Sequence, residues 1–600
     1  MKQARQIFRD ALLLTAAAFS MRTASVIFGV AVSRRAGPEA MGLFSLISGV
    51  YGFALTLATS GIQLGVTRVV TETLSRGNAA RVRAVLHRAI LYALICGSAA
   101  ALLLVSGAGL IGTRFLSDVR SVRPLRLFAM TLPLISFSSV CSGYFVAVRH
   151  ARRNAAVQIF GQAVRFALTV LLLLAVAPDN AEDICVLLVL GGAASEVLAF
   201  LVDLLLFLYD RKRAQNGLVA EPAPDEQRDL LKITIPVALT TYVRSGLVTL
   251  SHALVPAGLQ AGGMSHAAAL SAFGIIHSMA LPVILYPSAL IYSFGGLIIP
   301  AVADGMVENS PVHIRYMISR VLSLSLLFSI GVAGILVSFA EPLGELLYPH
   351  TGTGYYLRLL APLVPIMYVD AAVDSMLKGM GEQLTSMRIN VADALISVLM
   401  VRFLVPHWGI SGYLFAIWFS ECFNTVLSVT RLLTVGKARV RLLKWVGKPL
   451  LSVVGATWGT HLLFGRVAPL TVPAAVLQIS VAALLYLLLL VLFRSIDRED
   501  LSWFGELLSP NCPKGRACAP AVPAAPPPAS VTGRKNPPPA SAASFRDRPV
   551  PSAQNRYACG KAGSRYSSDL QTVRHWKQAP EPTVGHSADA PLPPCKPPCR

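Results

Sequence analysis

Apolar segments about as long as a bilayer is thick recur along most of the chain. A transmembrane helix needs roughly 20 predominantly apolar residues, and residues 1–495 contain about fourteen such segments separated by short polar breaks. Because backbone groups in lipid must be satisfied internally, long continuous apolar runs are typical of helices. We therefore predict an all-α polytopic membrane protein. The predicted helices cover residues 11–32, 43–70, 86–111, 124–147, 156–177, 183–208, 230–255, 267–302, 316–340, 356–378, 386–405, 409–434, 445–465 and 470–493.

Composition and charge agree with this fold class. The chain is 54% hydrophobic and 14% charged, whereas soluble domains carry about 25% charged residues. The formal net charge of +22 raises the question of nucleic acid, but the basic residues lie mostly in short loops, where they set membrane topology. Their bias predicts a multi-pass protein of the cell membrane with both termini cytoplasmic and no nucleic-acid partner. We interpret residues 11–32 as a retained helix, not a cleaved signal.

The polar breaks divide the chain into regions. We predict an N-terminal six-helix lobe, a cytoplasmic linker, a C-terminal six-helix lobe, two further helices and a Pro-rich tail too poor in aliphatic residues to form a core. Similar layouts around helices 4–5 and 10–11 suggest two pseudo-repeats, a common transporter plan. The long segment 267–302 contains Pro282 and Pro287, so it could be two pieces. These regions are residues 1–210, 211–229, 230–435, 436–495 and 505–600.

Four arginines lie inside predicted helices. Arg22 is near the middle of the first, Arg165 and Arg244 lie within the fifth and seventh, and Arg68 is towards the end of the second. A charge at the bilayer centre costs at least about 2.5–3.5 kcal/mol and usually faces a polar interior. We predict a cationic chamber that binds an anion. The alternatives are that Arg68 reaches the cytoplasmic interface and that Arg165 and Arg244 are structural ion-pair partners.

Polar residues at helical spacing support a chamber. Helices 1, 2, 5 and 7 each carry a polar stripe along one face, although hydroxyl groups also join helices without binding anything. Guanidinium groups match phosphate oxygens with paired hydrogen bonds, so the predicted ligand carries phosphate. The residues predicted to bind it are Arg22, Arg68, Arg165, Arg244, Gln63 and Gln162.

Acidic residues at depth lie later in the chain. Asp370, Asp374 and Lys378 are spaced by four, and Asn390 and Asp393 lie early in helix 11. These acids and the amide are predicted to couple transport to Na⁺ or H⁺; simple pairing with the arginines or with Lys378 is the alternative. Beyond such an ion, no cofactor or metal site is predicted. The chain lacks nucleotide-binding and zinc-hydrolase motifs, so we do not predict an enzyme.

Two blocks of sequence carry a family resemblance. The stretch RAGPEAMGLFSLISGVYGFALTLATSGIQLGVTRVVTETLSRGN (35–78) resembles the opening helices of polysaccharide-biosynthesis flippases, particularly the stage V sporulation protein B group. Residues 235–305 are similar to that group's seventh and eighth helices. The resemblance extends in layout over about residues 5–495 and places the chain in the multidrug/oligosaccharidyl-lipid/polysaccharide exporter superfamily, which includes lipid II flippases.

This resemblance implies a fourteen-helix flippase that works by alternating access on an undecaprenyl-pyrophosphate-linked saccharide, plausibly for peptidoglycan. Arg22 and Arg68 fall where the group carries basic residues, and helices 13 and 14 would flank a groove for the lipid tail. The lipid II flippase sodium site uses an acid in helix 7, where this chain offers only Arg244 and His252.

Two other functions are compatible with the sequence. One is a cation-coupled multidrug exporter, which would favour an acidic, aromatic-lined cavity. The other is a non-transporting scaffold for cell-wall synthesis enzymes, with the tail recruiting partners. Membrane lipid is an expected partner in every case.

Overall fold

The computed structural model describes residues 2–75, 79–148, 150–178, 180–213, 225–307, 311–438, 443–465 and 471–495. This part of the chain is helical and contains no strand, which confirms the all-α prediction. The predicted tail, 505–600, and most of the predicted linker lie outside the described residues. The first-half helices are α1 (Lys2–Thr59), α2 (Ile62–Ser75), α3 (Ala79–Leu110), η1 (Ile111–Phe115), η2 (Val119–Ser121), α4 (Val122–Ala129), α5 (Leu132–Ala147), α6 (Ala151–Val176) and α7 (Ala181–Arg213).

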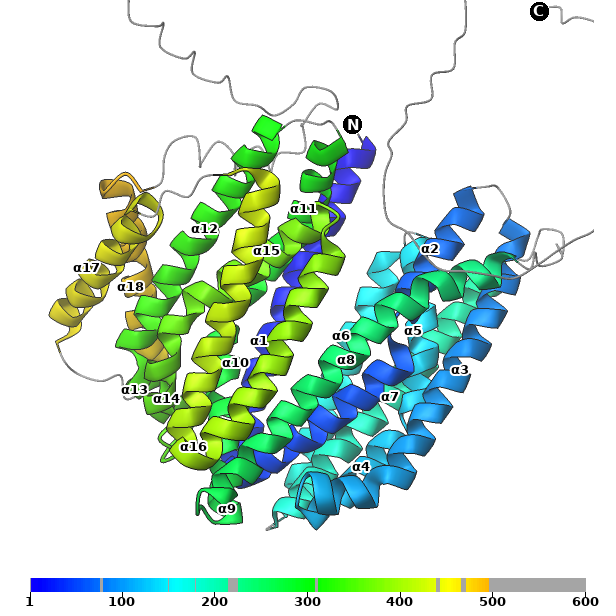
Figure 1. Cartoon of the computed structure of the whole chain (residues 1–600), viewed down its shortest axis with the longest axis horizontal. Coiled ribbons are helices and arrows are strands. Elements are labelled where there is room, and N and C mark those ends of the chain that lie inside the picture. Colours follow the sequence, from blue (N-terminus) through cyan, green and yellow to red (C-terminus); the bar gives the residue numbers. More distant parts are fainter. Residues whose placement is uncertain are drawn as a thin grey trace, which may run out of the picture. The chain divides into compact units, whose positions relative to one another are not determined.

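The second half is also helical (Figure 1). Its helices are α8 (Asp225–Ala261), α9 (His266–Gly274), η3 (Ile275–Ala280), α10 (Leu281–Leu285), α11 (Ser288–Val307), α12 (Pro311–Ser338), α13 (Ala340–Leu347), α14 (Thr353–Leu360), η4 (Ala361–Leu363), α15 (Val364–Gly379), α16 (Gln383–Gly436), η5 (Leu443–Gly447), α17 (Lys448–Phe464) and α18 (Val472–Leu492).

Two of these helices bend at a glycine. A straight helix of 58 residues, the length of α1, would extend about 87 Å, roughly three times the hydrocarbon thickness of a bilayer. α1 bends at Gly37, with φ of 75°, followed by Pro38, and α16 bends at Gly409, with φ of 57°, shortly after Pro406. Only glycine adopts such φ values without strain. The bends lie at the predicted breaks between residues 32 and 43 and between 405 and 409.

Proline and glycine interrupt other predicted helices. The segment 267–302 is divided into α9, η3, α10 and α11, with the last break at Tyr286 and Pro287, so the alternative of two pieces is correct. The predicted helix 43–70 breaks at Gly61, where φ is 77°. The predicted helix 124–147 bends by 44° between α4 and α5.

Nine helices in the described residues are long and apolar enough to cross a membrane, or ten if the bent pair of α4 and α5 is one span. In this number α1 and α16 are each counted as a single helix, although each bends at a glycine. The polytopic membrane fold is thus confirmed, while the total of fourteen stays a prediction.

The first helix of each half packs against both halves. The side chain of Thr23 on α1 bonds to the Tyr286 hydroxyl at 2.9 Å, while Phe28 stacks on Phe166 of α6 with ring centroids 4.3 Å apart. Correspondingly, α8 packs along α16 and also against α1. In Figure 1, α1 (dark blue) accordingly passes from the neighbourhood of α11 to that of α3.

Candidate substrate-binding site

Four carboxylates of the second half form what we call the acidic cluster. Asp370 and Asp374 lie one turn apart on α15, and Asp393 and Glu421 lie on the two arms of α16. Asp370 is within electrostatic range of the other three carboxylates. Helices α15 and α16 pack side by side, which brings these residues together. So many acids inside an apolar bundle are unfavourable unless cations or protons compensate them.

One acid of the cluster carries its own cation. The Lys378 ammonium lies 2.6 Å from the Asp374 carboxylate, four residues away. This is the pairing with Lys378 that was predicted from the sequence as an alternative to ion coupling. The Ser386 hydroxyl donates to the same carboxylate at 2.5 Å, and Asn390 donates to the Ser386 carbonyl at 2.9 Å. Asp374 is therefore a neutralised, hydrogen-bonded member of the cluster. Asn390 holds Ser386, the residue whose hydroxyl donates to Asp374.

Two acids have neutral hydrogen-bond donors. The Asn424 amide donates to Asp370 at 3.0 Å, and the Ser420 hydroxyl donates to Asp393 at 2.5 Å. These donors fix the positions of the carboxylates but do not neutralise them. Their charge is free to act on Arg244, on a coupling ion or on a proton.

Arg244 of α8 faces the acidic cluster. Its guanidinium interacts electrostatically with Asp370, Asp393 and Glu421, and the side chain is exposed. α8 packs along α16, which explains how an arginine of helix 7 reaches acids of helices 10 to 12. This attraction leaves both the predicted substrate-binding role of Arg244 and the ion-pairing alternative as predictions.

Arg22 lies beside the same cluster on a different element. Its guanidinium is within electrostatic range of the hydroxyls of Tyr292 on α11 and Tyr368 on α15. Tyr292 in turn interacts with Asp370, as well as with Asp374 and Glu421. Tyr292 is therefore within electrostatic range of both Arg22 and the acidic cluster.

The predicted polar stripes meet in pairs. The Gln162 amide of α6 donates to the Ser25 hydroxyl of α1 at 3.1 Å, one turn from Arg22. The Thr56 hydroxyl of α1 lies 3.3 Å from the Ser245 hydroxyl of α8. Helix 1 thus faces helix 5, and helix 2 faces helix 7.

The other predicted residues of the first half have nearer partners. Arg165 interacts electrostatically with Glu196 of α7 and with Tyr51 of α1. Arg68 makes an exposed ion pair with Glu72, four residues later on α2, at 3.0 Å. Gln63 is exposed on the same helix. Of the predicted basic residues, Arg244 interacts with the acidic cluster and Arg22 with Tyr292 and Tyr368, whereas the contacts of Arg68 are local.

Sequence reasoning did not single out the tyrosines of this site. Tyr292 lies in a long apolar segment without a polar stripe, and Tyr368 lies two residues before Asp370; a tyrosine in such segments is usually core or interface. The Tyr368 hydroxyl donates to the Ile284 carbonyl at 2.7 Å, just before the break at Pro287. A tyrosine hydroxyl at such a break satisfies a backbone carbonyl that the proline leaves without a partner. The proline was therefore the sequence signal that could have pointed to a tyrosine in this place.

Comparison with solved structures identifies the fold. The lipid II flippase MurJ in its inward closed conformation has a TM-score of 0.61 at 13% identity, covering 80% of this chain and 99% of that one. An inward-facing multidrug resistance MATE family transporter of the MOP superfamily has a TM-score of 0.58 at 13% identity, covering 70% and 95%. The fold is that of MOP superfamily transporters.

Sequence comparison gives relatives of the chain. The chain matches the model of the polysaccharide biosynthesis protein family over residues 7–304. It is also similar to stage V sporulation protein B of Bacillus subtilis, with 22% identity over 508 residues that cover 83% of this chain and 98% of the relative. These findings confirm the resemblance predicted from residues 35–78 and 235–305.

Proposed function

We propose that the chain is a flippase that moves an undecaprenyl-pyrophosphate-linked saccharide, a precursor of peptidoglycan or of another polysaccharide, across the cytoplasmic membrane by alternating access. The observation that carries this proposal is the state of Arg22. Within the described residues no ion pair involves Arg22, whereas Arg68 pairs with Glu72. An exposed guanidinium among tyrosines, without a carboxylate of its own, is suited to bind diphosphate oxygens.

The surroundings of Arg22 extend the proposed contacts. Gln162 is placed one turn away through Ser25, and its amide suits hydroxyls of a saccharide. α17 and α18 expose large apolar side chains, among them Leu451 and Leu488, which suit a polyprenyl tail that stays in lipid. The sugar and diphosphate would occupy the polar interior while the tail remains outside.

The acidic cluster would supply the driving force. Binding of a cation or proton to Asp370, Asp393 or Glu421 would release Arg244 from those carboxylates, and reversal would restore the pairing. Within the described residues, no three His, Cys, Asp or Glu side chains are close enough to hold a metal ion together. Either a proton or Na⁺ bound at these carboxylates would serve as the coupling ion. The scheme places both termini in the cytoplasm, as the loop charges predict.

The test is transport in reconstituted vesicles with a fluorescent undecaprenyl-pyrophosphate-linked saccharide. Arg22→Ala is expected to lower the initial rate by about 10- to 100-fold, the loss of one charge-assisted contact, and Arg22→Lys to restore part of it. The matched control is Arg402→Ala, which removes an exposed arginine of α16. Equal rates for Arg22→Ala and the control would contradict the proposed role of Arg22.

A second candidate function is export of cationic drugs. It is favoured by the acidic cluster, because carboxylates at depth attract an organic cation as well as a proton. The same vesicles loaded with a cationic dye separate the two functions. Dye export driven by a proton gradient, together with no movement of the lipid-linked saccharide, would favour the exporter.

A scaffold that recruits cell-wall synthesis enzymes is the remaining alternative, and deletion of residues 505–600 tests it. The flippase proposal expects unchanged transport in vesicles from the truncated chain. A truncation that spares transport but abolishes co-purification of such enzymes would add a recruiting role for the tail.

A further inference from the structure

A buried carboxylate lies in the turn between α3 and α4. The Asp118 side chain is 3% exposed, and it caps η2 by accepting a hydrogen bond from the Arg120 backbone N–H at 2.9 Å. The Asp118 backbone N–H donates to the Gly112 carbonyl at 2.8 Å. The Ser121 hydroxyl donates to the Asp118 carbonyl at 2.7 Å. The local turn therefore fixes the direction of this carboxylate.

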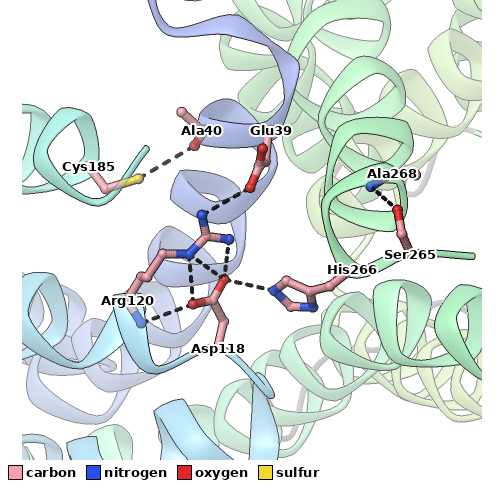
Figure 2. A network of polar contacts seen from close by, with 8 residues as sticks. All are labelled: Glu39, Ala40, Asp118, Arg120, Cys185, Ser265, His266 and Ala268. Carbon is pink, nitrogen blue, oxygen red and sulfur yellow. Dashed lines mark hydrogen bonds and ion pairs between the residues drawn. The ribbon is translucent and has the colours of Figure 1, made fainter. Parts of the chain in front are cut away.

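Arg120 links Asp118 to the bend of α1. Its Nη2 donates to Asp118 Oδ2 at 2.8 Å and its Nε to Oδ1 at 3.0 Å. Its remaining nitrogen, Nη1, donates to Glu39 Oε1 at 2.9 Å. Glu39 is two residues beyond Gly37, where α1 changes direction. The three charged side chains all belong to the first half of the chain (Figure 2).

The fourth member of the network comes from the second half. His266, the first residue of α9, places Nε2 2.9 Å from Asp118 Oδ2. Ser265, whose hydroxyl accepts from the Ala268 N–H at 3.3 Å, caps α9 and sets this histidine at the start of the helix. Figure 2 shows the imidazole reaching towards the carboxylate from the α9 side.

The two halves also touch through backbone beside this network. A Cβ added at Gly42 of α1 would lie 2.1 Å from the Leu270 carbonyl oxygen of α9, and one at Gly274 would lie 2.2 Å from the Pro38 carbonyl oxygen. The Ser278 hydroxyl of η3 donates to the Met41 carbonyl at 3.0 Å. This end of the bundle, which we call the Asp118 end, is closed by direct contact between α1 and α9.

We infer that His266 and the Glu39–Arg120–Asp118 group form a latch that holds the two halves together at the Asp118 end and opens when the transporter exposes its site there. The inference builds on the alternating access of the proposed function. The His266 to Asp118 hydrogen bond is where the latch parts, because His266 is its only member from the second half. After opening, Arg120 still neutralises Asp118, so separation leaves no buried carboxylate without a cation.

The test measures the conformation without substrate or transport. Spin labels at Arg114→Cys and Ala267→Cys, both exposed positions on either side of the latch, report the distance across the Asp118 end after the native cysteines are replaced. In His266→Ala we expect the ratio of open to closed molecules to rise roughly tenfold, as for the loss of one hydrogen bond to a charged group. His266→Gln, whose amide can still donate, should restore part of the closed population.

The matched control is His350→Ala. His350 also lies by a carboxylate, Glu345 at 3.4 Å, but it is 93% exposed and both residues belong to the second half. Its removal should leave the distances unchanged. Identical distance distributions for wild type and His266→Ala in correctly folded protein, or equal shifts for His266→Ala and His350→Ala, would overturn the latch. Because no substrate is present, this result is independent of whether the chain moves a lipid-linked saccharide.

Discussion

The close approach of α1 and α9 makes Gly42 a sensitive position. In Gly42→Ala the new methyl group would stand 2.1 Å from the Leu270 carbonyl oxygen and 2.9 Å from its carbon. Non-bonded heavy atoms are comfortable at roughly 3.5 Å, so α1 and α9 must separate by about 1 Å. Both neighbours are backbone, and no side-chain rotation can relieve the clash.

The expected magnitude follows from this overlap. Inserting a methyl group into a closely packed contact costs about 1–3 kcal/mol, and each 1.4 kcal/mol is a factor of ten in an equilibrium. We therefore expect Gly42→Ala to shift the equilibrium at the Asp118 end towards the open form by about 5- to 150-fold. The purified protein should also unfold at a lower temperature.

Gly29→Ala is the control on the same helix, because a Cβ there meets nothing within 4 Å. Alanine is favoured over glycine in a helix by about 1 kcal/mol, so this variant should be neutral or slightly more stable. The assay compares thermal unfolding and the distance between labels at Arg114→Cys and Ala267→Cys. If Gly42→Ala matches Gly29→Ala in both measurements, the close backbone contact does not hold this end closed.

Three further outcomes are expected. Asp393→Asn should remove the dependence of vesicle transport on an imposed proton gradient and lower the rate at least about tenfold; a gradient dependence equal to wild type would contradict coupling through this acid. Burial opposes ionisation of Asp118, but hydrogen bonds from Arg120 and His266 outweigh it and hold its pKa below the ordinary value. Its contribution to the stability of the folded protein is therefore complete above about pH 3.9 and is lost as the pH falls through the lowered pKa; the drop in unfolding temperature caused by Asp118→Asn should be the same at pH 7 and pH 5 and disappear in stronger acid, and a drop already absent at pH 5 would refute this. Arg68→Ala should reduce transport much less than Arg22→Ala, because its exposed ion pair contributes at most about 1 kcal/mol and competes with phosphate binding; equal losses would restore Arg68 to the substrate site.

The breaks in the helices were predictable because their chemistry is local. Gly37 and Gly409 adopt positive φ within three residues of a proline, and both residue types mark such positions in any sequence. The pairing of polar stripes was also predictable. In an apolar bundle, a polar side chain has few possible hydrogen-bond partners other than the polar side chains of another helix. The bond between Gln162 and Ser25 is an instance.

The partners of the charges could not be predicted in the same way. Arg244 comes within electrostatic range of Asp393 through the packing of α8 on α16, and these two residues are far apart in sequence. His266 and Asp118 lie in short connections without periodicity, so no pattern connects them. Their hydrogen bond depends on how two halves meet, which amphipathic spacing within one helix does not encode.

The crossing of α1 between the halves has a consequence for biogenesis. Arg34 of α1 donates to the Leu347 carbonyl at the end of α13, 313 residues later, at 2.9 Å. Thr23 of α1 forms its hydrogen bond with Tyr286, which is also synthesised much later. This early segment therefore acquires some of its permanent neighbours only after the second half has been made. Until the second half has been synthesised, a helix carrying Arg22 has to persist in the bilayer without them, and slow synthesis between the halves should increase its degradation.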